Sequence, residues 1–203
     1  MLVAVFALGA LEVLAPPIVE REIQYRVEDR VPEASEVTVE IDSFPVVPTV
    51  LSTGGVRRLV VTLLGVEGDQ VDLTRLTVDL EGPVLERSAL LDGEAALEKV
   101  DSAVLTAEID EADIADALSG LGVSVVDLTP GGVSLTANGV TVDAQVAVID
   151  GVLQVSAGSL GSLSVPLPRI DLFPCEPSGE VLADRVRVQC TVEEVPEWLV
   201  QQV

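Results

Sequence analysis

Residues 133–156 carry the pattern that most restricts the fold of this chain. Apolar and polar residues alternate in three runs, which are separated by Asn138-Gly139 and Asp150-Gly151. These dipeptides favour the positive φ angles of two-residue hairpin turns, and alternation is typical of a strand with one buried face. The sequence therefore predicts a three-stranded antiparallel meander over residues 133–137, 140–149 and 152–156.

Further runs rich in Val, Leu and Ile lie on both sides of this meander. β-branched aliphatic residues suit pleated strands, and runs of about ten residues are long enough to coil around a helix. The run 71–80 requires one bulge or register change, because Leu73 and Leu76 cannot otherwise share a face. Further strands are therefore predicted at residues 37–42, 56–65, 71–80, 84–91, 100–109, 163–167 and 181–192.

A charged segment near the N-terminus carries one apolar stripe. Its apolar residues recur at intervals of four, which indicates a helix with one buried side. The helix begins with proline in its first turn and ends at Pro32. The stripe consists of Val19, Ile23, Val27 and Val31.

A second helix is predicted from Glu111 to Ser119. Asp110 precedes it as the capping residue and Gly120 follows its end. Its narrow apolar face comprises Ile114, Ala117 and Leu118. Between the first strands, residues 43–55 are apolar and interrupted by two prolines, so they are expected to form a short helix or turn across a sheet.

The first fifteen residues form a separate hydrophobic segment. Residues 2–11 are uncharged and apolar, but they are too short to span a membrane and lack the basic start of a signal peptide. We interpret residues 1–15 as an N-terminal anchor or signal remnant, and residues 16–203 as a single domain. The alternative is that this segment is a buried first helix of the domain.

Charge and composition exclude several classes of function. The net charge is −23 and only eleven residues are Lys or Arg, which argues against a nucleic-acid partner and against polybasic membrane docking. The chain has no histidine, so the usual activated nucleophiles and imidazole metal sites are missing. No enzyme activity, cofactor or metal is expected. An acid-dependent hydrolase that uses two carboxylates is the catalytic alternative.

Two cysteines, Cys175 and Cys190, stand near the C-terminus. Neither belongs to a CxxC motif, and no histidine accompanies them, so a zinc or redox site is not favoured. In an exported protein they would form a disulfide that stabilises the fold by about 3 kcal/mol. Two free buried thiols are the alternative.

The order of these elements resembles a known family. The relevant segments are the hydrophobic start, the helix over 18–31, the strand and FPVVP segment over 37–55, the AEIDEADIADALSG helix over 107–120, and IDGVLQV over 149–155. Together they resemble the LmeA-type family of actinobacterial envelope phospholipid-binding proteins. The resemblance implies an α+β, mostly β fold: a long curved antiparallel sheet wrapped around an N-terminal helix and one or two short helices, with an apolar cavity.

The resemblance also implies a non-catalytic protein of the cell envelope, outside the cytoplasm and held at the membrane by its N-terminus. Its partner would be a phospholipid, whose acyl chains occupy the cavity in support of envelope lipid or glycolipid maintenance or transfer. We expect Arg57 or Arg58 to contact the headgroup phosphate. The alternative is an envelope interaction module with a fully packed core. The expected acyl-chain contacts are Val19, Ile23, Val27, Val46, Val47, Val50, Leu51, Ile114, Leu118 and Leu121.

Overall fold

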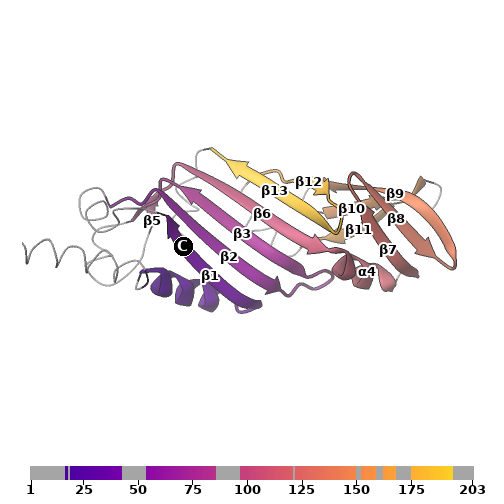
Figure 1. Cartoon of the computed structure of the whole chain (residues 1–203), viewed down its shortest axis with the longest axis horizontal. Coiled ribbons are helices and arrows are strands. Elements are labelled where there is room, and N and C mark those ends of the chain that lie inside the picture. Colours follow the sequence, from indigo (N-terminus) through magenta and orange to yellow (C-terminus); the bar gives the residue numbers. More distant parts are fainter. Residues whose placement is uncertain are drawn as a thin grey trace, which may run out of the picture.

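The protein is elongated, with two antiparallel β-sheets placed one after the other along its length (Figure 1). The structure is a computed structural model and describes residues 17, 19–42, 54–85, 97–120, 122–149, 152–158, 162–167 and 175–193. Strands dominate these residues, which confirms the prediction of a mostly β fold. The single long sheet that was expected is divided into a six-stranded and a five-stranded sheet.

The six-stranded sheet has the order β1-β2-β3-β6-β13-β12, and all neighbouring strands are antiparallel. Consecutive strands β1 to β3 form a meander, whereas β13 returns from the end of the chain to pair with β6. Its strands are β1 (Ala34–Asp42), β2 (Arg58–Val66), β3 (Leu73–Glu81), β6 (Ser102–Asp110), β12 (Ser178–Val181) and β13 (Arg185–Val192).

The five-stranded sheet is a pure meander in the order β11-β10-β9-β8-β7. The predicted strands 140–149 and 152–156 are confirmed residue for residue as β9 and β10. Asn138 and Gly139 have φ angles of 51° and 76°, as a two-residue hairpin turn requires. The strands are β7 (Val123–Thr129), β8 (Gly132–Ala137), β9 (Val140–Ile149), β10 (Val152–Ser156) and β11 (Ser162–Pro166). A two-stranded pair, β4 (Val84–Leu85) and β5 (Leu97–Lys99), adds to these.

The predicted N-terminal helix is present over residues 19–30. Ile23 and Val27 pack against the hydrophobic core, and Val31, just after the helix, is 7% exposed. The helix lies beside β1, where Glu20 Oε1 accepts a hydrogen bond of 3.1 Å from the Ile41 N–H. The helix therefore covers part of the edge of the six-stranded sheet (Figure 1).

Helix α4 (Glu111–Ser119) has the predicted bounds and buried face, with Ile114 2% and Leu118 0% exposed. It packs against β7 and β6 at the boundary between the sheets. Asp110 occupies the predicted N-cap position, but its side chain makes no capping hydrogen bond. Instead, Glu111 Oε2 accepts a hydrogen bond of 2.9 Å from the Leu128 N–H and so ties α4 to β7.

Three strand predictions are corrected by the structure. The run 181–192 contains a hairpin, β12 and β13, rather than one strand, and β7 was not predicted. β3 keeps one register with both neighbours, so it contains no bulge. Leu73 and Leu76 point to opposite faces and are 1% and 0% exposed, because both faces of the sheet are covered near the boundary between the sheets.

Candidate functional site

One face of the six-stranded sheet is composed of aliphatic side chains in continuous rows. Strand pairing places Val39, Val61, Val78, Leu105 and Cys190 side by side, with equivalent rows before and after. Side chains alternate between faces along each strand, so these rows share one side of the sheet. We call this the aliphatic face; its other rows are Ile41, Leu59, Leu80, Ala103 and Val192, and Val37, Leu63, Leu76, Ala107 and Val188.

Exposure of the aliphatic face changes along the strands. The row from Val37 to Val188 is fully buried, with no member more than 3% exposed. In the two rows nearer Asp42, several side chains are only partly buried: Ile41, Val78, Leu80 and Val192. The aliphatic face is thus accessible towards the Asp42 end and closed towards the five-stranded sheet.

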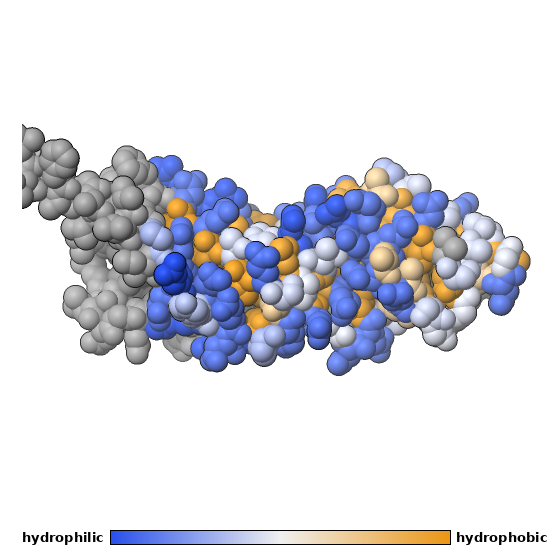
Figure 2. Space-filling model, turned by 60° about the horizontal axis from the view of Figure 1, so that its bottom comes forward, coloured by the Kyte–Doolittle hydropathy of each residue, from blue (hydrophilic) through white to orange (hydrophobic). Residues whose placement is uncertain are grey.

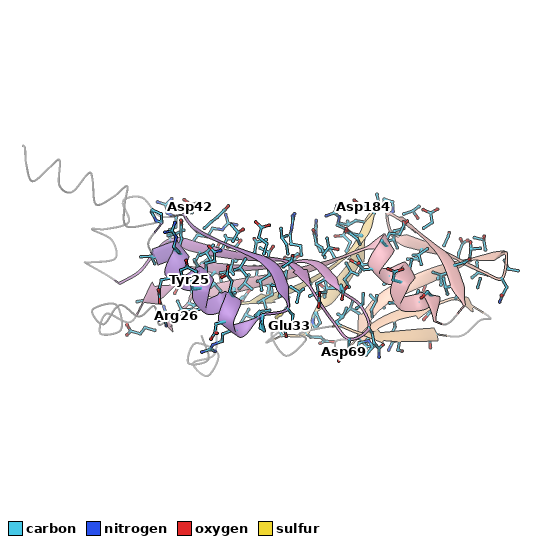
Figure 3. All side chains as sticks on the ribbon, turned by 90° about the horizontal axis from the view of Figure 1, so that it is seen from below. Tyr25, Arg26, Glu33, Asp42, Asp69 and Asp184 are labelled. Carbon is cyan, nitrogen blue, oxygen red and sulfur yellow. A yellow bond between two sulfur atoms is a disulfide. The ribbon has the colours of Figure 1, made fainter. Side chains whose placement is uncertain are left out.

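The opposite face of the same sheet is polar. Its central row contains Thr38, Thr62, Thr77 and Thr106, paired strand to strand. On either side of this row lie ion pairs, including that of Arg58 with Asp79. The six-stranded sheet therefore separates a polar surface from an aliphatic one. Figure 3 shows that Asp42, at the end of β1, and Asp184, just before β13, lie well apart along the molecule.

Glu108 is the buried charged residue of the polar face among the described residues, at 7% exposure. Arg185 donates to its Oε2 at 3.0 Å and Arg187 to its Oε1 at 3.1 Å. Burial by itself raises the pKa of the Glu108 carboxyl, but the two arginine hydrogen bonds outweigh it and the pKa lies below its ordinary value. These ion pairs join β6 to β13 and so link two neighbouring strands of the sheet.

The five-stranded sheet has an aliphatic face of the same kind, which contributes to a single core with the first sheet. Gly179 of β12 lies against Val148 of β9, and the Gly131 N–H donates to the Val181 carbonyl at 3.0 Å. Figure 2 shows hydrophobic side chains reaching the surface between hydrophilic ones along the described part of the molecule. The core residues of this sheet include Val126, Leu128, Val133, Leu135, Ala144, Leu153 and Val155.

The structure distributes the predicted acyl-chain contacts over two places. Val19 is partly buried on the N-terminal helix, and Ile23 and Val27 contact the core beside β1. Ile114 and Leu118 are buried under α4, farther along the molecule (Figure 1). The remaining predicted contacts lie outside the described residues: Val46, Val47, Val50, Leu51 and Leu121.

Arg57 and Arg58 occupy different environments despite being neighbours. Arg58 belongs to the polar face, where it donates to Asp79 Oδ1 at 2.7 Å; this hydrogen bond and the Asp79 charge raise its pKa. Arg57 is exposed and stands just before β2, where its carbonyl accepts a hydrogen bond from the Gly82 N–H. Arg57 is therefore the cation with more freedom to meet an anion.

The partly exposed residues Ile41, Val78 and Leu80 were not among the predicted contacts. Alternation along the predicted strands 37–42 and 71–80 already placed each of them on an apolar face. What the sequence could not indicate was that these two strands lie on either side of β2, so that the three side chains line the same end of one face.

The predicted pairing of the cysteines is confirmed by a disulfide between Cys175 and Cys190. Such bonds are typical of proteins outside the reducing cytosol. Among the described residues, no helix is long and apolar enough to cross a membrane, and no group of three or more acidic or cysteine side chains could hold a metal ion. The proposed anchor, residues 1–15, lies outside the described residues.

Comparison with known proteins assigns the chain to a family. The family model for LmeA-like phospholipid-binding proteins matches residues 10–196, which is nearly the whole chain. No curated protein and no solved structure matches the chain. Because the family match extends across both sheets and covers far more than half of the chain, the chain belongs to the LmeA-like phospholipid-binding family.

Proposed function

We propose that this protein binds a phospholipid by placing acyl chains against the accessible end of the aliphatic face. The observation that supports this most directly is the set of partly exposed aliphatic side chains Ile41, Val78 and Leu80 on an otherwise buried, uncharged surface. The described rows of the aliphatic face contain no aromatic ring and no charge, as suits saturated hydrocarbon. The membership of the family supports the same class of ligand.

The energy available from such a surface is sufficient for binding. Burial of one methylene contributes about 0.8 kcal/mol, so ten methylenes contribute roughly 8 kcal/mol. Association costs about 4–15 kcal/mol in lost translational and rotational freedom. One chain would therefore bind weakly, and two chains would bind stably without strong contacts to the headgroup.

For the headgroup we propose contact between its phosphate and Arg57. Arg58 is the weaker candidate because its guanidinium is engaged by Asp79 on the other side of the sheet. The proposed role is non-catalytic: the protein holds lipid in support of cell-envelope maintenance or transfer. The disulfide supports a location outside the cytoplasm, and the apolar residues 1–15 are proposed to hold the protein at the membrane.

Native mass spectrometry of the full chain purified from membranes tests this proposal. The expected result is a population heavier than the bare chain by one phospholipid, which disappears after extraction with organic solvent and returns after incubation with phosphatidylethanolamine vesicles. If only the bare chain appears before and after incubation, the proposal is wrong. The fully buried row from Val37 to Val188 favours the second candidate, an interaction module with a packed core, and that result would support it.

A further inference from the structure

The end of the five-stranded sheet that points away from the six-stranded sheet carries an exposed aliphatic side chain (Figure 1). At one end of β8 the Gly131 N–H donates to the Val181 carbonyl of β12, so the hairpin turn Asn138-Gly139 at the other end of β8 points away from that sheet. Val140 directly follows this turn and is 62% exposed. We use the term distal end for residues 119, 120, 122–124 and 136–141.

The aliphatic side of the five-stranded sheet becomes more exposed towards the distal end. Val140 pairs with Ala137, and Val142, the next residue of β9 on the same side, pairs with Leu135. Leu135 is 3% exposed, Val142 is partly buried, and Val140 is mostly exposed. The apolar interior of this sheet therefore reaches the surface beside the turn.

The chain segments that form the distal end carry no charge. The protein has 34 acidic residues and a net charge of −23, but residues 117–126 and 128–142 contain no Asp, Glu, Lys or Arg. Asp116 lies one turn before the end of α4, and Asp127 and Asp143 lie on strands further from the hairpin turn. The described segments of the distal end are therefore neutral in a strongly acidic protein.

Polar groups at the distal end are hydrogen-bonded to one another. Ser124 Oγ donates to the Thr136 carbonyl at 3.0 Å, and the hydroxyl oxygens of Thr136 and Thr141 are 2.8 Å apart. The pairing of β8 with β9 continues up to the turn. A polar group that leaves water costs free energy unless it is hydrogen-bonded, so these internal bonds lower the cost of moving the distal end out of water.

A lipid bilayer is the partner whose chemistry matches these features. Its interior accepts aliphatic side chains and internally bonded backbone but strongly disfavours charge. Anionic lipids give a bilayer a negative surface potential, so a protein with a charge of −23 approaches most easily through a neutral part. A stable protein interface buries about 1,200–2,000 Å², whereas a single exposed aliphatic residue at a hairpin turn, Val140, suits shallow insertion.

We propose that the distal end inserts Val140 and the turn before it into the surface of a phospholipid bilayer. The hydroxyls of Thr136 and Thr141 then lie among the headgroups, and the acidic remainder of the protein stays outside. This surface is separate from residues 1–15, and the N-terminal helix lies towards the opposite end of the molecule (Figure 1). The proposal goes beyond the proposed function, because it does not depend on where acyl chains bind.

A fluorescent probe at the distal end of the full chain tests insertion locally. Both native cysteines are held in the disulfide, so a thiol-reactive nitrobenzoxadiazole label attaches to an introduced cysteine. With Thr141→Cys, the fluorescence should rise at least twofold when vesicles of phosphatidylethanolamine and phosphatidylglycerol are added. Gln145→Cys is the matched control, because it is exposed on the same face of β9 but roughly 13 Å further from the turn. Equal responses at the two positions, or none at Thr141, would overturn the proposal.

Two substitutions that add the same charge test the role of Val140. In the labelled Thr141→Cys protein, Val140→Asp should raise the lipid concentration for half of the response at least tenfold. Ala147→Asp, at an exposed position of β9 away from the distal end, should change that concentration less than threefold. Equal effects of the two substitutions contradict insertion of Val140. Equal melting temperatures of the two variants show that both are folded.

Salt dependence separates insertion from attraction between charges. Between about 50 and 500 mM NaCl the lipid concentration for half of the response should fall, because salt screens the repulsion between the acidic protein and phosphatidylglycerol. A rise with salt contradicts the proposal. A response to protein concentration without vesicles would show that a second copy covers this end, and would also overturn it.

Native mass spectrometry of the same samples distinguishes this proposal from the proposed function. If the probe at Thr141 does not respond but a bound phospholipid is detected, insertion of the distal end is wrong and the lipid site is retained. If the probe responds and no phospholipid is bound, the distal end is a membrane contact and the acyl-chain site is wrong.

Discussion

Gly179 in β12 lies so close to Val148 in β9 that no side chain fits between them. A Cβ placed on Gly179 would come within 2.6 Å of Val148 Cγ2. This contact joins the edge of the six-stranded sheet to the face of the five-stranded sheet and makes their aliphatic residues one core. The absence of a side chain at one position therefore determines how the two sheets meet.

Gly179→Ala should lower the free energy of unfolding by about 1–3 kcal/mol, because the new methyl group overpacks the contact. Val148→Ala in the same chain should recover part of this loss, since it removes the nearer clashing methyl. Urea denaturation of both single variants and the double variant measures the coupling. Gly120→Ala is the control, because nothing lies within 4 Å of a Cβ there; equal stability of the Gly179 and Gly120 variants would contradict the prediction.

Glu108→Gln should destabilise the protein by about 1–3 kcal/mol, because two arginine hydrogen bonds lose their charged acceptor. Glu98→Gln, on the exposed strand β5, should change stability by less than about 0.5 kcal/mol. Chemical denaturation near neutral pH compares the two variants.

The lowered pKa of Glu108 predicts that the stability of the protein depends on pH. The pKa of Glu108 is lower in the folded protein than its ordinary value of 4.5, so its contribution is fully present above pH 4.5 and is lost as the pH falls through the folded-state pKa. The difference in stability between the wild type and Glu108→Gln should therefore shrink as the pH is lowered below 4.5. A difference that stays constant down to acid unfolding would be inconsistent with this.

Leu80→Gln should weaken phospholipid binding by about tenfold, since it removes a large part of one apolar contact from the accessible end of the aliphatic face. Val60→Gln lies on the neighbouring strand but on the polar face, and it should leave binding unchanged. Titration with a fluorescent phospholipid analogue measures the dissociation constants of both variants and of the wild type. Equal binding by the wild type and Leu80→Gln would exclude this end as the acyl-chain site.

The double substitution Cys175→Ala with Cys190→Ala should lower the free energy of unfolding by about 3 kcal/mol, because it removes the disulfide that closes the hairpin of β12 and β13. Reduction of the wild type should produce a similar loss, whereas the same reductant should not affect the double variant. Melting temperatures under oxidising and reducing conditions provide the measurement. Unchanged stability of the reduced wild type would show that packing around Cys190 alone holds this hairpin.

The sequence by itself determined the elements whose signals are local. The Asn138-Gly139 turn, with positive φ at both residues, marked the start of β9. An apolar stripe of period four defined the N-terminal helix, and the bounds of α4 followed from its helical pattern. Residues close in the chain make these interactions, so they depend little on the rest of the fold. The alternation along β1 likewise assigned the apolar side of that strand, whereas for β3 it required a bulge that the structure does not contain.

Only the tertiary structure decided which strands lie together and where the fold divides. The pairing of β13 with β6, the division into two sheets, and the placement of Ile41, Val78 and Leu80 at one end of the same face all join segments far apart in the sequence. No local pattern encodes such partners, because many strands share the same aliphatic alternation and would pair equally well by composition. Contacts such as that of Gly179 with Val148, which depend on the space left between packed backbones, select one arrangement among them.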